Sequence, residues 1–70
     1  MNDKHVYKKI GLVGSSRESV EDAVRGAVTR AAKTVRNMEW FEVKEMRGWI
    51  KDGEVQHFQV TLQVGFRLDE

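Results

Sequence analysis

The feature that most constrains the fold is a strict alternation of apolar and polar residues near the C-terminus. One parity is apolar throughout and consists of Phe58, Val60, Leu62, Val64, Phe66 and Leu68. The other parity is mainly polar and contains His57, Gln59, Thr61, Gln63 and Arg67. Because successive side chains of a strand point to opposite faces, residues 55–68 are predicted to form one long amphipathic strand. At about 3.3 Å per residue it spans roughly 45 Å, so its ends are expected to extend past one subunit and pair with others.

A helical period occupies the first half of the chain. Apolar residues recur at i, i+3, i+4 and i+7 at Val20, Ala23, Val24, Ala27, Val28, Ala31, Ala32 and Val35. This spacing predicts a helix over residues 17–37 whose thin apolar face lets it lie close against a sheet. A strand is predicted before it, over residues 6–13, followed by a turn over residues 14–16 with Ser16 as the N-cap.

A further strand is predicted over residues 39–50, with an irregularity near its middle. Its apolar residues change parity between Phe41 and Val43 on one side and Met46, Gly48 and Ile50 on the other. A β-bulge near Lys44 or Glu45 would return all five to one core face. The same bulge would place Arg47 and Trp49 on the face that carries Trp40.

Asp52-Gly53 predicts a tight hairpin between the last two strands. The predicted fold is therefore α+β, a β-α-β-β subunit with a three-stranded antiparallel sheet wrapped on one helix, and residues 1–70 are expected to form a single domain.

Composition narrows the class of protein. A chain of 70 residues without cysteine cannot be stapled by disulfides and is marginal as a monomer, so assembly is expected. A net charge of +1 disfavours a nucleic-acid surface.

The sequence also bears on location. No apolar run is long enough to span a membrane, and the N-terminus lacks a signal-peptide pattern, so a cytoplasmic location without membrane contact is expected. His5 and His57 lie too far apart for a metal-ligand spacing, so no metal site is predicted.

Trp40 is the leading candidate for a binding residue. It shares a strand face with Glu42 and Lys44, where the pattern favours water, so its ring needs another subunit or a flat ligand as partner. Gln59 lies on the polar face of the next strand. If position 40 pairs with position 65, the two side chains are about 20 Å apart along the ladder, and only a symmetric assembly would bring them together.

Trp40 and Gln59 suit a planar heteroaromatic ligand. An indole offers a stacking surface, and an amide can pair with a uracil-like edge, which points to a base or an isoalloxazine ring. The alternatives are simple packing of Trp40 between subunits and solvation of Gln59. No Ser-His-Asp or Cys-His set is present, so an enzyme is not predicted.

The chain resembles the dodecin family along most of its length. The matching stretches are Val6-Tyr7-Lys8-Lys9-Ile10, Val13-Gly14-Ser15-Ser16, Arg30-Ala31-Ala32-Lys33-Thr34-Val35, Trp40-Phe41-Glu42-Val43, Arg47-Gly48, and Phe58-Gln59-Val60-Thr61 with Val64-Gly65-Phe66-Arg67-Leu68. The resemblance implies a hollow homododecamer that stores flavin without catalysis. It implies FMN as the ligand, with riboflavin or FAD as alternatives, and coenzyme A as a further ligand of some members.

The resemblance also assigns roles to residues. Trp40 from each of two subunits would sandwich a stacked pair of flavins, and Gln59 would hydrogen-bond the pyrimidine edge. Arg47 would contact the ribityl or phosphate part, and Arg67 would support subunit contacts. Two departures from the family pattern are Gly11, where a glutamate is common, and Trp49, where a polar residue is common.

Three rival functions are considered beside flavin storage. The first is a shell that mainly binds coenzyme A or another nucleotide-like ligand. The second is an RNA-binding sheet that stacks bases on Trp40 and Trp49, which the near-neutral charge disfavours. The third is a flavin enzyme, which would need an open substrate position beside the ring.

Overall fold

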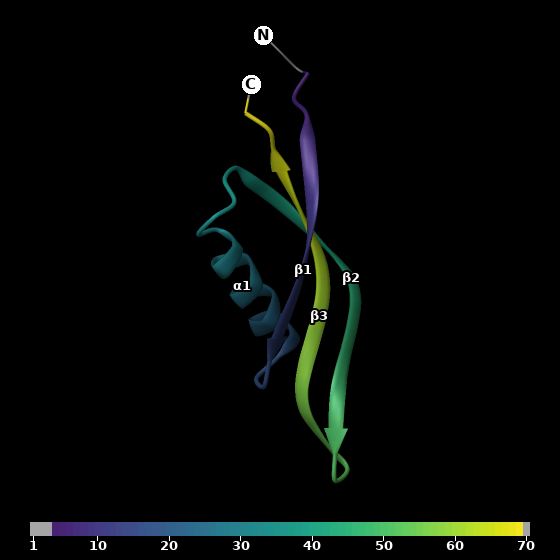
Figure 1. Ribbon diagram of the computed structural model, residues 1–70. Coiled ribbons are helices and arrows are strands. Elements are labelled where there is room, and N and C mark those ends of the chain that lie inside the picture. The colour runs from purple at the N-terminus through teal and green to yellow at the C-terminus, as the bar shows by residue number, and fades with distance from the viewer. Residues whose placement is uncertain (1–3, 70) are drawn as a thin grey trace.

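The computed structural model describes residues 4–69. In chain order it contains β1 (Tyr7–Ser16), α1 (Val20–Ala31), β2 (Met38–Lys51) and β3 (Glu54–Arg67). The strands form one antiparallel sheet in the order β1-β3-β2, and α1 packs along one side of it (Figure 1). The predicted β-α-β-β fold is confirmed. The first three residues of the polar N-terminus and the last residue of the predicted domain lie outside the described residues.

The core lies between α1 and the centre of the sheet. Val60, Leu62 and Val64 of β3 and Ala23 of α1 are at most 2% exposed. Other apolar side chains pack around them, namely Ile10, Leu12, Val20, Val24, Ala27, Val28 and Met38. The alternation of β3 therefore predicts the buried residues at the centre of the strand, because β3 is the central strand and its apolar parity faces α1. Leu68, predicted to belong to the same strand, lies beyond the end of β3 and is 40% exposed.

The start of the helix differs from the prediction. Gly14–Ser16 belong to β1 and do not form a turn, and the N-cap is Ser19, whose Oγ accepts a hydrogen bond from the Asp22 N–H at 3.0 Å. Ser16 has a supporting role, since its Oγ accepts from the Glu18 N–H at 2.8 Å and donates to the Asp22 carboxylate at 2.7 Å. Ser16, at the end of β1, and Ser19, the residue before α1, flank the same short loop, which is why the sequence alone selects the wrong cap.

The helix also ends earlier than the predicted Asn37. After Ala31 the backbone tightens, and the Lys33 N–H donates to the Arg30 carbonyl at 3.2 Å in an i to i−3 bond. Asn37 then adopts a left-handed φ of 65° just before β2 begins. The helical spacing of Ala and Val continues beyond Ala31, but the chain must turn there to bring β2 alongside β3.

Gly14 allows β1 and α1 to approach closely. A Cβ at this position would collide with the backbone oxygen of Ala23 and lie 3.0 Å from the Cβ of Ala27. The small residues on both elements thus produce the close helix–sheet contact that the thin apolar face of the helix predicts.

The predicted bulge in β2 is confirmed. The register with β3 shifts between Val43 and Glu45, and two further shifts lie between Met38 and Trp40 and between Trp49 and Ile50. The five apolar or small residues of β2 consequently oppose apolar residues of β3: Phe41, Val43, Met46, Gly48 and Ile50 pair with Val64, Leu62, Val60, Phe58 and Val55. They share the α1 face, as predicted.

These β2 residues are not buried within the subunit, so their prediction as part of the core is wrong in this respect. Phe41 is 51% exposed and Ile50 is 76% exposed. The physical reason is that α1 packs on β1 and β3 and leaves β2 largely uncovered.

The hairpin between β2 and β3 turns at Asp52 and Gly53, whose φ values are 54° and 80°. Two positive values are typical of a type I′ turn, so the predicted hairpin is confirmed. β1 ends where Ser16 pairs with Phe58, and the hairpin therefore projects beyond it as a two-stranded ribbon (Figure 1). The subunit is elongated, with extents of 57 × 21 × 14 Å.

Candidate ligand-binding site

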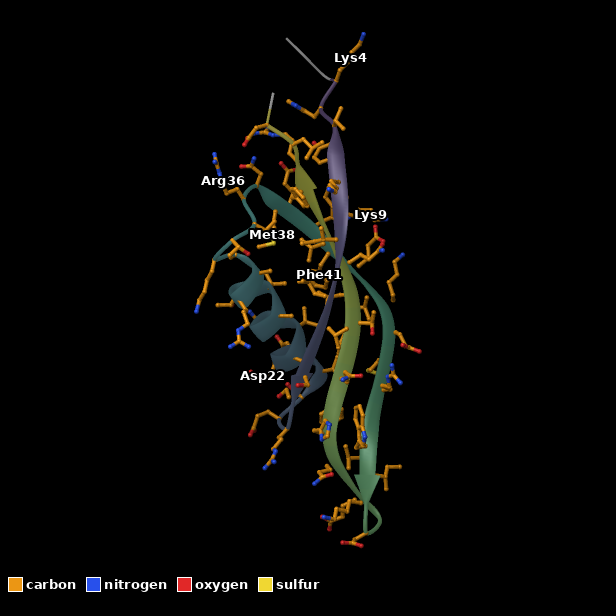
Figure 2. All side chains as sticks on the ribbon, in the orientation of Figure 1. Lys4, Lys9, Asp22, Arg36, Met38 and Phe41 are labelled. Atoms are coloured by element: carbon orange, nitrogen blue, oxygen red, sulfur yellow. The ribbon has the colours of Figure 1, made fainter. Side chains whose placement is uncertain are left out.

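Trp40 lies on the sheet face opposite α1. The register places Lys9, Gly65 and Trp40 in one row across β1, β3 and β2. Figure 2 shows Lys9 projecting away from α1, whereas Met38 lies on the side of α1. The prediction that Trp40 faces away from the core, and that position 40 pairs with position 65, is confirmed.

The indole of Trp40 lies directly over Gly65. A Cβ on Gly65 would overlap the six-membered ring of the indole, so only glycine leaves room for the ring against the β3 backbone. The ring of Tyr7 meets the indole at a centroid distance of 5.3 Å and an interplanar angle of 66°, an edge contact. The side chain is therefore held by two neighbouring strands while 37% of Trp40 remains exposed.

Glu42 fixes the edge of the indole. Its carboxylate accepts hydrogen bonds from Trp40 Nε1 at 3.3 Å and from Lys44 Nζ at 2.9 Å, and it pairs with Lys9 Nζ at 3.2 Å. The hydrogen bond from Lys44, followed by those from Lys9 and Trp40, lowers the pKa of Glu42 to about 2. The carboxylate is thus ionised at neutral pH, and the indole N–H has a permanent acceptor.

Arg47 and Gln59 form a second group on the same face. They are direct cross-strand partners, and Gln59 is half-buried. Arg47 Nη2 lies 3.7 Å from the Glu45 carboxylate, with both side chains 60% exposed. The next pair toward the hairpin is Trp49 with His57, whose rings are stacked at a centroid distance of 4.5 Å and an interplanar angle of 18°.

The two groups lie apart within one subunit. Trp40 pairs with Gly65, whereas Gln59 pairs with Arg47, a separation of six residues along β3 or roughly 20 Å. The structure thus brings Arg47 and Gln59 together but keeps Trp40 away from both. A single ligand ring therefore cannot contact Trp40 and Gln59 of the same subunit.

Gly11 lies on this face between the two groups, paired with Gln63. A Cβ built on Gly11 meets nothing within 4 Å, so an alanine would meet no obstacle within the subunit. Arg67 lies at the far end of the face, where it pairs with Tyr7.

Sequence reasoning missed the contacts that hold Trp40. Glu42 could have been found, because it lies two residues from Trp40 on the same strand face. Gly65 could have been found from its predicted pairing with position 40, since a glycine opposite a tryptophan leaves space for the ring.

Features of other kinds of site are absent from the part of the chain that the structure describes. Across residues 4–69, no three side chains of the His, Cys, Asp and Glu types cluster as metal ligands would. Within the same range, no helix has the length and apolar character needed to cross a membrane.

Comparisons with known proteins agree with this architecture. The Dodecin family model matches residues 6–69. A dodecin from Thermus thermophilus is 55% identical over 65 residues, which cover 93% of this chain and 94% of the relative.

Solved structures are similar over almost the whole chain. The dodecin from Streptomyces davaonensis has a TM-score of 0.90 and 48% identity, covering 97% of this chain and 100% of that one. The dodecin from Streptomyces coelicolor has a TM-score of 0.91 and 51% identity, with 99% of each chain covered. The Thermus protein was also solved with a tryptophan changed to phenylalanine and with either of two arginines changed to alanine. Those three positions are spaced as Trp40, Arg47 and Arg67 are here.

Proposed function

Because the chain belongs to the dodecin family, we propose that it binds flavin, as FMN, riboflavin or FAD, and stores and shields it without catalysis. The observation that carries the proposal is the indole of Trp40, laid over Gly65 on an otherwise polar face and fixed by Tyr7 and Glu42. A ring held in this way is a preformed stacking surface, so little side-chain entropy is lost on binding.

The polar residues complement such a ligand. The amide of Gln59 offers one acceptor and two donors, which match the pyrimidine edge of an isoalloxazine ring. The guanidinium of Arg47 is the cross-strand neighbour of Gln59 and can contact the ribityl chain or its phosphate. The stacking itself contributes about 0.5–1.5 kcal/mol per aromatic pair beyond the burial of area.

The site requires assembly. Trp40 of one subunit and Gln59 of another would complete it across a two-fold axis, with two flavins stacked between two copies of Trp40. The exposed apolar residues of β2 and a groove of about 540 Å³ between α1 and Phe41 support packing against neighbouring copies. The proposed assembly is the hollow homododecamer of the family.

The sandwich explains storage rather than catalysis. A flavin covered on one face by an indole and on the other by a second flavin has no open position for a substrate. The indole of Trp40 would donate an electron to a flavin excited by light and take it back, so the light energy would be lost without net chemistry. Two covered faces also limit access of oxygen to the ring.

Titration of flavin fluorescence tests the proposal. Riboflavin, FMN and FAD are added to the ligand-free protein, and the native mass is measured in parallel. Binding should quench the fluorescence, and Trp40→Ala should weaken binding by at least tenfold, because the stacking surface and the cover over Gly65 are both lost. Lys33→Ala, at an exposed position beyond α1, serves as the control and should bind as the unchanged protein does.

Two results would contradict the proposal. One is unchanged flavin affinity in Trp40→Ala at an unchanged native mass. The other is binding of coenzyme A with no quenching of any flavin, which would support the alternative of a coenzyme A shell.

A further inference from the structure

Trp49 and His57 form an aromatic surface that the flavin site does not use. The two rings are stacked, 4.5 Å apart and 18° from parallel, and Trp49 remains 41% exposed. Because β1 ends at Ser16, the pair stands on the two-stranded part of the hairpin with no third strand beside it. A stacked, partly exposed pair of rings is a suitable platform for a further flat ring.

This surface is continuous with the proposed flavin site. Trp49 pairs with His57 two residues along the strands from the pair of Arg47 and Gln59, and both pairs lie on the same face of the sheet. Two residues of a strand span roughly 6.6 Å, which is the spacing between the backbone positions of Arg47 and Trp49 on this face. A ribose bridges a comparable distance between a phosphate and its base.

Arg47 is available to a phosphate. Its contact with Glu45 is long, at 3.7 Å, and both side chains are 60% exposed. Exposed ion pairs of this kind contribute little, so a diphosphate can take the place of the carboxylate. Arginine also suits phosphate oxygens because its planar group donates two parallel hydrogen bonds.

We propose that Trp49, supported by His57, binds the adenine ring of FAD while Arg47 binds the diphosphate, so that the protein prefers FAD to FMN. This inference rests on the proposed flavin function and deepens it. FAD is FMN extended by a second phosphate and an adenosine, and the row from Gln59 through Arg47 to Trp49 presents the matching groups in that order. Stacking on His57 already holds the indole, which reduces the entropy lost on binding.

The test compares FMN and FAD on the same variants. Affinities are measured by fluorescence quenching for the unchanged protein, Trp49→Leu and Trp49→Phe. The unchanged protein should bind FAD more tightly than FMN. Trp49→Leu should weaken FAD binding about tenfold and leave FMN within about twofold, whereas Trp49→Phe should retain most of the preference, since a phenyl ring still stacks.

A second arm needs no variant. Adenosine added to the unchanged protein should raise the apparent Kd for FAD and leave that for FMN unchanged, because only FAD would occupy the adenine position and adenosine has no phosphate to compete for Arg47. The proposal that Trp49 binds adenine is contradicted if Trp49→Leu weakens FMN and FAD binding equally or weakens neither. It is also contradicted if Trp49→Leu changes only the native mass of the assembly. Those results leave the flavin site intact, whereas absence of FMN binding to the unchanged protein would contradict the proposed function itself.

Discussion

At the scale of single residues, two glycines on one sheet face differ in what lies above them. A Cβ on Gly65 would overlap the indole of Trp40, whereas a Cβ on Gly11 meets nothing within 4 Å. Gly65 therefore fixes the position of the ring, and the absence of a side chain at Gly11 has no steric cause.

Alanine substitutions at these two glycines provide a matched test of whether Gly65 fixes the position of the Trp40 indole. Gly65→Ala should destabilise the protein by about 1–3 kcal/mol through overpacking and weaken flavin binding at least tenfold, since the indole must move. Gly11→Ala should leave flavin binding unchanged and stabilise the strand by about 0.5–1 kcal/mol. Urea unfolding and a flavin titration measure both effects. Equal behaviour of the two variants would show that the indole does not depend on Gly65.

At the scale of elements, the start of α1 depends on Ser19. Ser19→Ala removes the hydrogen bond to the Asp22 N–H and should cost about 1 kcal/mol of stability. Ser15→Ala, on an exposed position of β1, should have little effect. Urea unfolding of both variants measures the difference in stability. A larger loss of stability in Ser15→Ala than in Ser19→Ala would show that the start of α1 does not depend on Ser19.

Element-level features that depend on local pattern were predictable. The alternation of β3 predicts the buried residues Val60, Leu62 and Val64, and the parity change in β2 predicts the bulge beside Lys44. Both follow from side-chain direction along a strand, which needs no knowledge of distant contacts.

Features that depend on contacts between different helices and strands could not be predicted from the local sequence pattern. The helix ends at Ala31 because β2 must reach β3, although the Ala and Val spacing continues. Phe41 is exposed because α1 covers β1 and β3, and periodicity does not say which strands a helix covers. For the site, the sequence indicates the shared face of Trp40, Glu42, Arg47 and Gln59, but the fit of the indole over Gly65 depends on the register to within one residue.

At the scale of the whole molecule, the subunit leaves much of its apolar surface uncovered. Among the described residues the fully buried core is small, and large apolar side chains of β2 such as Phe41 and Met46 face solvent on the α1 side. A subunit of this kind gains much of its stability from contacts with other copies.

Met46→Glu tests this dependence. A charge on the exposed apolar side of β2 would be buried against a neighbouring copy, so the variant should lose the native mass of the assembly and unfold at a lower temperature. Met46→Leu keeps an apolar side chain of similar volume and should retain both properties. Native mass spectrometry and thermal unfolding at two protein concentrations provide the measurement. An assembly that survives Met46→Glu would place its contacts on another face.

The bulge at Lys44 has a consequence for changes in chain length. It takes up a single extra residue, so that Arg47 and Trp49 share a face with Trp40. Deleting Lys44 would remove the extra residue, so that Glu45, Met46 and Arg47 would follow Val43 in regular alternation and both side chains would stay on the face of Trp40. A shortening of β2 by one residue at the bulge is therefore a change in chain length that the strand can absorb with its side-chain directions intact.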